Sequence, residues 1–250
     1  MEEGRKQNRG PLRLRPRLAL AMELAGQGAV AADIGCDHGL LSCALLEQGR
    51  FSRVIAADIS ESSLEKCRAL ANLRGLTDGL SLRVGDGLSC LAPGEADTLF
   101  LLGMGGTLIA RILEAADPPL MGAKLAVLSP MAGPGIADLR EYLYRHGYSI
   151  QEDRLVEEEG RLYQLLSVLP PSKDGLEPLP KGWPEDCFEL GYRAFEYRVP
   201  LFDRALDQRI LAHEKRLTSA KGSVGEEIIA KRLEQLNTIK RMLEDVHEAE

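Results

Sequence analysis

Residues 29–39 read AVAADIGCDHG and decide the class of fold. The apolar run up to Asp33 predicts a buried strand, and Gly35 and Gly39 predict a tight turn that opens the next helix. Strand, glycine turn and helix together form the first unit of a nucleotide-binding α/β sheet, in which the ligand lies at the turn.

The same alternation of an apolar run and a helical pattern continues along the chain, with further runs at 53–59, 80–86, 98–103 and 124–130. Continuous apolar runs are typical of parallel strands buried on both faces. Residues 149–169 then read as two strands around a turn near Glu159-Gly160. Such a hairpin at the sheet edge is typical of class I methyltransferases and untypical of nicotinamide-binding domains. The predicted fold is therefore α/β, a Rossmann-like, mostly parallel sheet with an antiparallel terminal strand.

Five of the thirteen prolines fall between residues 170 and 186, which predicts a linker. We expect a catalytic domain with a basic N-terminal arm over residues 1–170, a Pro-rich connection over 171–199 and a helical hairpin over 200–250. Apolar residues recur at helical spacing after residue 200 and break at Lys221-Gly222-Ser223. Charges of both signs on the hairpin favour a solvated helix pair over a dedicated RNA surface.

The composition, 44% hydrophobic and 28% charged in 250 residues, is that of a globular protein, and no apolar window is long enough for a membrane span. Five cysteines without a CxxC pair indicate neither a disulfide framework nor a zinc site, so we expect a cytoplasmic protein without a metal. The net charge of −7 speaks against a nucleic-acid partner. The basic arm tempers that conclusion, although its charges alone favour a frayed, solvated terminus. Its Lys and Arg residues are Arg5, Lys6, Arg9, Arg13, Arg15 and Arg17.

The glycine turn carries two carboxylates, Asp33 and Asp37. A turn that binds pyrophosphate reads GxGxxG, because the helix N-terminus must face the phosphates without a competing anion. Two carboxylates repel phosphate and suit a ligand with a sulfonium and an amino group, which points to S-adenosylmethionine. A purely structural Asp-Gly turn is the alternative.

Two more acidic residues follow the next strands. Asp58 can accept hydrogen bonds from ribose hydroxyls, and Asp86 beside Gly87 can reach the adenine amine. A helix N-cap and a simple turn are the respective alternatives. Three acidic strand ends in succession are harder to explain structurally than any one of them.

The fourth strand ends in Gly103-Met104-Gly105-Gly106, where many amino methyltransferases have Asn-Pro-Pro-Tyr. The glycine turn leaves room for a flat base but supplies no acid or base, and a tight turn into a helix is the alternative. His38 beside Asp37 reads as a hydrogen-bonded structural pair more readily than as a catalyst.

Four motifs resemble those of the bacterial tRNA (adenine-22, N1)-methyltransferase family: residues 33–39 (DIGCDHG), 85–87 (GDG), 103–106 (GMGG) and 128–130 (LSP), followed by a helical hairpin. The resemblance implies a class I fold and methyl transfer from S-adenosylmethionine to N1 of adenine 22 of tRNA. Met131 departs from the family, which often has a polar residue such as Asn there.

The resemblance also implies roles for individual residues. Asp37 is the expected catalytic residue, because a carboxylate near the reacting centre would stabilise the positive charge that develops on the adenine ring. The expected contacts to the cofactor are Asp33, Gly35, Cys36, His38, Gly39, Asp58, Ile59, Asp86, Gly87, Gly103, Met104 and Gly105. The resemblance implies that the basic arm and the helical hairpin hold the tRNA, and the expected contacts to tRNA are Arg13, Arg15, Arg17, Gly106 and Pro130.

The alternatives are a methyltransferase with another RNA, a protein or a small molecule as acceptor, and a binding protein that keeps the fold without catalysis. Intact carboxylates at the strand ends argue against the second. A nicotinamide oxidoreductase is the least favoured interpretation. A monomer is compatible with the sequence, which leaves the oligomeric state open.

Overall fold

The computed structural model describes residues 10–131, 133, 135–172, 178–222 and 224–248. Arg5, Lys6 and Arg9 of the expected basic arm therefore lie outside the described residues, as do Ala132 and Pro134 beyond the fifth strand.

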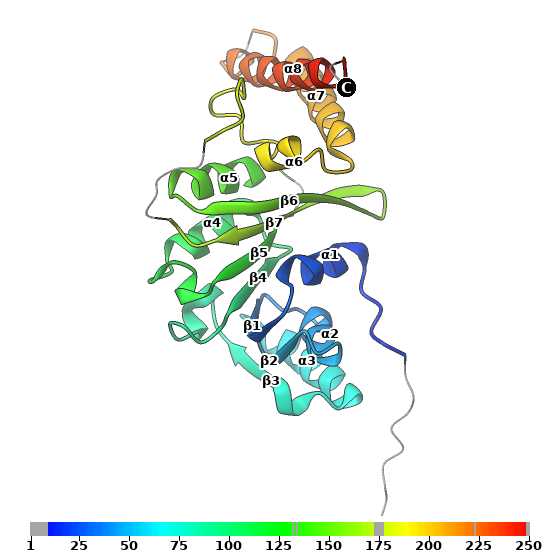
Figure 1. Cartoon of the computed structure of the whole chain (residues 1–250), viewed down its shortest axis with the longest axis vertical. Coiled ribbons are helices and arrows are strands. Elements are labelled where there is room, and N and C mark those ends of the chain that lie inside the picture. The colour runs from blue at the N-terminus through cyan, green and yellow to red at the C-terminus, as the bar shows by residue number, and fades with distance from the viewer. Residues whose placement is uncertain (1–9, 132, 134, 173–177, 223, 249–250) are drawn as a thin grey trace, which may run out of the picture.

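A single seven-stranded sheet forms the centre of the molecule (Figure 1). The strand order is β3-β2-β1-β4-β5-β7-β6, parallel from β3 through β5, with β7 antiparallel to both β5 and β6. This order confirms the predicted fold class. The strands are β1 Gly28–Ile34, β2 Phe51–Asp58, β3 Leu80–Val84, β4 Thr98–Leu102, β5 Leu125–Ser129, β6 Ser149–Glu158 and β7 Arg161–Leu169.

Helices cover both faces of the sheet, which is why the central strands are apolar throughout. In β4, Leu99 and Leu101 face one side and Phe100 the other, and all three are fully buried. One apolar cluster joins the sheet to α4 and α5, and a second joins it to α1 and α2. The eight α-helices of the described residues are α1 Pro16–Ala25, α2 Leu40–Glu47, α3 Glu61–Arg74, α4 Gly106–Glu114, α5 Gly135–Arg145, α6 Tyr192–Glu196, α7 Phe202–Ser219 and α8 Glu226–Glu248.

Helix α1 begins inside the segment that we expected to be a basic arm, which ends at Arg17. It begins with Pro16 at its first turn, a position that proline favours because its missing N–H would be unpaired there. Ala21, Met22 and Ala25 form its buried face, and the helix packs against β5, β6 and β7. The N-terminal segment therefore contributes a wall of the sheet domain from residue 16 onward.

The expected connection over 171–199 contains folded structure. Trp183 donates its indole N–H to the carbonyl oxygen of Cys187 (3.1 Å), and both side chains are buried. Phe188 and Leu190 are also buried, and helix α6 follows them. Since Trp183, Cys187 and Leu190 share an apolar cluster with the sheet, the connection is packed onto the sheet domain over its second half. The division of the chain into domains remains a prediction.

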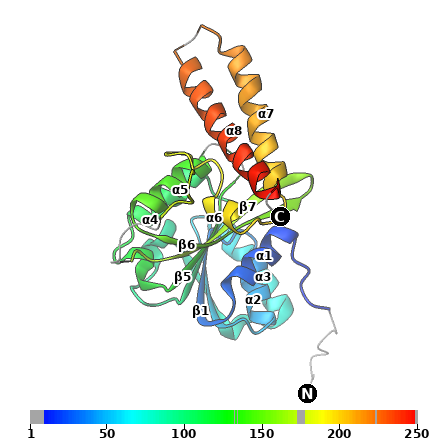
Figure 2. The ribbon, with the colours of Figure 1, turned by 45° about the horizontal axis from the view of Figure 1, so that its top comes forward.

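Helices α7 and α8 form an antiparallel hairpin that projects from the β6 end of the sheet (Figure 2). Phe202, Leu206 and Ile210 of α7 and Ile239 of α8 join the main apolar cluster at the base of the hairpin. An ion pair between Arg204 and Glu157 (2.6 Å) adds a link from α7 to β6. The base of the hairpin is thereby held at a fixed place beside the sheet.

Along the part of the chain that is described, no helix combines the length and the apolarity needed to cross a bilayer. The carboxyl ends of β1 to β5 meet at one edge of the sheet, where ligands bind in open α/β sheets. Because β7 is antiparallel, the turn between β6 and β7 lies at that same edge.

Candidate functional site

The turn after β1 holds a conformation that depends on glycine. Gly35 and Gly39 have φ of 74° and 70°, and Asp37 between them has φ of 49°. The backbone N–H groups of Gly35 and Cys36 both donate to the carbonyl oxygen of Ala57 at the end of β2 (2.8 and 3.0 Å). The ends of β1 and β2 are thus tied together, and the turn stands open toward the sheet edge.

Asp33 is a buried carboxylate at the base of this turn, with 4% of its surface exposed. The Ser42 hydroxyl donates to it at 2.6 Å. Burial raises the pKa of Asp33 from 3.8 to about 6, because the charged form is costly away from water. A carboxylate in this state is stabilised by a cation placed beside it, such as an ammonium group of a ligand.

Asp37, His38 and Asp58 form a chain of contacts at the mouth of the turn. The Nδ1 atom of His38 lies 2.7 Å from an Asp37 carboxylate oxygen, and the two side chains are 58% and 72% exposed. The Asp37 N–H donates to Asp58 (3.1 Å), whose other carboxylate oxygen accepts the N–H of Ser60 (2.9 Å). Asp58 therefore connects the turn after β1 with the turn after β2. Ile59, the next residue along the chain, is 72% exposed.

Gly35 also brings the fourth turn into contact with the first. A Cβ on Gly35 would lie 2.5 Å from the terminal methyl carbon of Met104, so the two turns approach closely here. Gly103 has φ of 74° and its N–H donates to the Ser129 carbonyl oxygen (2.8 Å). Gly105 is the N-cap of α4. The GMGG turn thus bridges β1 and β5 at the sheet edge.

Gly106 and Pro130, expected as contacts to substrate, are both buried. A Cβ on Gly106 would lie 1.9 Å from the carbonyl oxygen of Gly135, where the first turns of α4 and α5 meet. Met131, by contrast, is 54% exposed at the same edge. Gly106 is therefore needed for helix packing.

A cavity of about 580 Å³ opens at the first and fourth turns and is closed on its third side by α1. It brings together eight of the predicted site residues and adds Glu158 from the β6–β7 turn. The eight are Arg15, Arg17, Asp33, Gly35, Cys36, Asp37, His38 and Gly103.

Arg17 reaches into this cavity from α1. Its backbone N–H donates to a Glu158 carboxylate oxygen (3.0 Å), and its guanidinium carbon lies 5.1 Å from the centre of the Tyr163 ring. One of its terminal nitrogens would lie 3.4 Å from a Cβ on Gly103. Its Nε atom is buried and has no hydrogen-bond partner among the described residues. The guanidinium is thus held in place at the cavity with hydrogen-bonding capacity left over for a ligand.

Arg13 and Arg15 differ from Arg17 in being exposed. Arg15 pairs with Glu159 (2.9 Å) with 64% of its side chain exposed. The three arginines of the arm, which sequence reasoning grouped as contacts to tRNA, therefore occupy two kinds of position.

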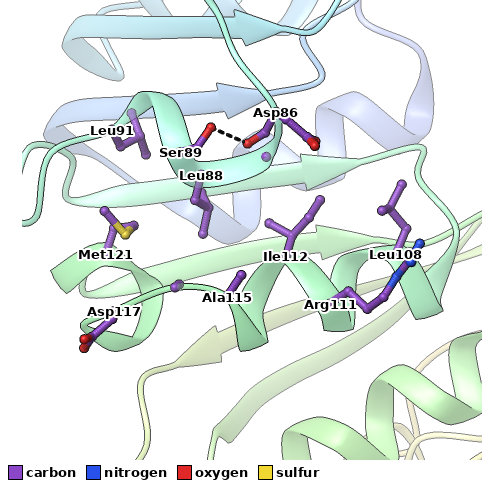
Figure 3. Close-up of a pocket in the computed structure, with 12 residues that line it drawn as sticks. Asp86, Leu88, Ser89, Leu91, Leu108, Arg111, Ile112, Ala115, Asp117 and Met121 are labelled. Atoms are coloured by element: carbon purple, nitrogen blue, oxygen red, sulfur yellow. Dashed lines mark hydrogen bonds between the residues drawn. The ribbon is translucent and has the colours of Figure 1, made fainter.

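Asp86 and Gly87 line a second cavity, of about 500 Å³, on the other side of the sheet edge (Figure 3). Asp86 lies at its rim, while Leu88 and Ile112 form apolar walls from the β3–β4 connection and α4. The Asp86 backbone carbonyl accepts the Ser89 hydroxyl (2.7 Å), and its carboxylate is exposed. An acidic group above an apolar wall suits the amine and the ring of a purine.

Comparison with known proteins agrees with this geometry. A family model described as a methyltransferase domain matches residues 14–166. The chain belongs to this methyltransferase family. Over 155 residues it is 37% identical to the tRNA (adenine(22)-N(1))-methyltransferase of Bacillus subtilis, covering 62% of this chain and 64% of that protein. The chain therefore spans less than two thirds of this curated relative in the sequence match.

Solved structures extend the similarity beyond the sequence match. The B. subtilis M1A22 tRNA methyltransferase TrmK superposes with a TM-score of 0.78 at 27% identity, over 91% of this chain and 99% of that one. A putative tRNA (m1A22) methyltransferase of Streptococcus pneumoniae in complex with S-adenosyl-L-methionine gives 0.76 at 25% identity, over 89% and 97%. The sheet domain and the helical hairpin of this methyltransferase are thus both part of the shared fold.

Sequence reasoning about the methyltransferase site missed two features. Glu158 and Tyr163 hold Arg17, and both come from the terminal hairpin, more than 130 residues away in the chain. The thiol of Cys67 fills the space where a Cβ on Gly39 would stand (2.1 Å), which explains why Gly39 is required. The sequence signal for α1 was Pro16 followed by apolar residues at helical spacing, which the structure shows to be buried. Among the described residues, no group of three or more His, Cys, Asp and Glu side chains is arranged to hold a metal ion.

Proposed function

We propose that this methyltransferase transfers a methyl group from S-adenosylmethionine to N1 of adenine 22 of tRNA. The observation that carries the proposal is the pairing of a buried carboxylate, Asp33, with a guanidinium that has an unused donor, Arg17, in one cavity. The methionine part of the cofactor carries an ammonium and a carboxylate, so it needs this combination of charges. The similarity to tRNA (adenine(22)-N(1))-methyltransferase supplies the acceptor.

The residues of the two cavities, together with Asp58 at the end of β2, fit the whole cofactor. Asp33 would hold the ammonium group and Arg17 the carboxylate. Asp58 would accept hydrogen bonds from the ribose, and Asp86 would accept one from the adenine amine above the apolar wall of Ile112. When bound, the cofactor supplies an electrophilic methyl group on a sulfonium. The remaining contacts expected from the sequence lie in the turns after β1, β2, β3 and β4: Cys36, His38, Gly39, Ile59, Gly87, Met104 and Gly105.

The chain itself has to orient the acceptor nitrogen. N1 of adenine has a lone pair at neutral pH, so no proton has to be removed before attack, and alignment supplies much of the acceleration. The product ring is cationic, and the exposed carboxylate of Asp37 stands at the mouth of the cavity, where it would stabilise that charge. His38 holds one Asp37 oxygen at 2.7 Å and so acts as a positioning residue. Arg17 and Asp33 bind the cofactor without taking part in the transfer.

The GMGG turn fits a ring nitrogen better than an exocyclic amine. It lacks the Asn-Pro-Pro-Tyr side chains that orient an amine in other methyltransferases, and it leaves open space beside Gly105. N1 of adenine lies on the pairing edge, so the base has to leave its stack to enter. A tRNA-modifying enzyme related to bacterial proteins would work in the cytoplasm of a bacterium and bind RNA, and a monomer would suffice.

The test is methyl transfer from labelled S-adenosylmethionine to two unmodified tRNA transcripts that differ only in adenine or guanine at position 22. We expect label in the first transcript alone, mapped to N1. Equal labelling of both transcripts would move the site elsewhere in the RNA. No labelling of either, with the cofactor still bound, would favour another acceptor or a non-catalytic binding protein.

A further inference from the structure

A third cavity, of about 320 Å³, lies between the sheet domain and the base of the helical hairpin. Its walls come from the start of β7, from α7 and from Gly133 beyond β5. Gly160 belongs to the β6–β7 turn. The other side of this turn carries Glu158 into the first cavity, which holds Asp33 and Arg17 and is called the cofactor cavity below. Figure 2 shows the base of α7 beside the hairpin of β6 and β7. The third cavity is therefore on the acceptor side of the same sheet edge.

The polar side chains of this cavity are hydrogen-bond donors. Arg161 and Arg209 bring two guanidinium groups, Gln164 and Gln208 bring amides, and no Asp or Glu is among the described residues that line it. This composition stands out in a protein of net charge −7. Donors without a competing carboxylate suit an anion.

Gln164 is fixed with its amide nitrogen free. Its side chain is 8% exposed, and its carbonyl oxygen accepts a hydrogen bond from Arg140 at 2.6 Å. Arg140 is itself locked by Asp153 in a fully buried ion pair at 2.9 Å. Because an arginine can only donate, the carbonyl end of Gln164 must face it. The NH₂ end makes no hydrogen bond to the described residues, so it can donate to a ligand.

Arg209 carries an unneutralised charge at this place. Its guanidinium is partly buried and makes no hydrogen bond or ion pair to the part of the chain that is described. Burial lowers the pKa of Arg209, because the charged guanidinium is costly away from water. The carboxylate that acts on it is Glu189, and His213 already holds that carboxylate at 2.9 Å. An arginine in this state gains most from an anion brought by a partner.

We propose that the cavity between β7 and α7 binds a backbone phosphate of the RNA substrate through Arg209 and the amide of Gln164, and so sets the position of the target base in the cofactor cavity. The inference rests on the proposed function and gives the helical hairpin a defined part in it. Phosphate contacts fix the register of a nucleic acid on a protein. A contact on one side of the β6–β7 turn would therefore align the nucleotide that enters on the other.

The test compares Arg209→Gln with Lys215→Gln, which removes the same charge from an exposed position of α7 outside the cavity. We expect Arg209→Gln to raise the Kd for tRNA on the order of tenfold and to lower the slope of log K against log salt by about 0.7 to 0.9. Lys215→Gln should change neither, and Arg209→Lys should restore the slope. The melting temperature of Arg209→Gln should not fall, because the guanidinium has no described partner to lose.

Phosphate-ethylation interference identifies the source of the anion. One ethylated phosphate should weaken binding to the wild type and to Lys215→Gln, and should make no further difference to Arg209→Gln. If the wild type methylates adenine-22 tRNA and Arg209→Gln keeps the wild-type Kd and salt slope, the phosphate site is wrong and the proposed function stands. If the wild type neither binds nor methylates tRNA, both are wrong.

Discussion

The two halves of the ligand-binding edge differ in the sign of their charges. The ends of β1, β2 and β3 carry Asp33, Asp58 and Asp86, whereas the ends of β4 and β5 carry glycines and are flanked by arginines of α1, β7 and α7. The acidic half suits a ligand with a sulfonium and an ammonium, and the basic half suits anionic groups, namely the cofactor carboxylate at Arg17 and an RNA phosphate at Arg209. The charge beside each ligand therefore matters more than the net charge of −7.

Asp37 stands where the two halves meet, and replacing it should have the largest effect. In Asp37→Asn we expect the rate of methyl transfer to fall about a hundredfold or more, because the amide cannot stabilise the cationic ring. Asn tolerates the φ of 49° at this position, whereas Ala would add backbone strain. Single-turnover kinetics would measure the rate of methyl transfer, and calorimetric titration would measure the affinity for the cofactor, so a loss of rate can be told apart from a loss of binding.

The matched control for this variant is His38→Asn, which removes the ring that holds the Asp37 carboxylate and leaves the acid in place. It should lower the transfer rate less than Asp37→Asn does. If Asp37→Asn lost transfer rate and cofactor affinity to the same extent, Asp37 would only bind the cofactor, as the acidic half does, and would not stabilise the product ring.

Asp33 gives the acidic half a measurable dependence on pH. Since its pKa is raised from 3.8 to about 6, the folded protein holds a proton that the unfolded chain releases between these values. The free energy of unfolding should therefore decrease as the pH rises through this window, by about 3 kcal/mol at most. Asp33→Asn should be more stable than the wild type at pH 8 and should lose this pH dependence, as urea denaturation at pH 4 and pH 8 would reveal.

Cofactor affinity should change in the opposite direction. The ionised Asp33 is the form that binds an ammonium, so the wild-type Kd for S-adenosylmethionine should fall as the pH rises from 5 to 7, and the Kd of Asp33→Asn should stay high throughout. A wild-type Kd that is constant over this range would mean that Asp33 is only a structural partner of Ser42.

The acidic half of the edge could be predicted from the sequence, because it depends on local patterns of apolar and acidic residues. Apolar runs indicated the five parallel strands and the terminal hairpin, and Asp33, Asp58 and Asp86 were predictable because each stands at or just beyond the carboxyl end of one of those strands. Segments with a mixed pattern were harder. Basic residues concealed α1, and prolines concealed the packing of Trp183 onto the sheet domain.

The basic half depends on contacts between distant parts of the chain. Arg17 reaches the cavity because Glu158 and Tyr163 hold it there, and Arg209 is desolvated because α7 packs beside β7. Nothing in the spacing of Arg13, Arg15 and Arg17 distinguishes the one that is partly buried. These positions follow from tertiary packing, which a single sequence without its fold does not encode in any local pattern.

The last prediction divides the arm that the sequence left as one group. Arg17→Gln should raise the Kd for S-adenosylmethionine about tenfold, because the cofactor carboxylate loses its guanidinium. It should bind 5′-deoxy-5′-methylthioadenosine, which lacks that carboxylate, as well as the wild type does. The double variant Arg13→Gln and Arg15→Gln should keep the wild-type affinity for both ligands and weaken tRNA binding by about threefold, since exposed charges contribute little. If Arg17→Gln, like the double variant, weakened tRNA binding and left cofactor binding unchanged, Arg17 would belong to the RNA surface. The cofactor cavity would then neutralise only the ammonium group of the cofactor, through Asp33.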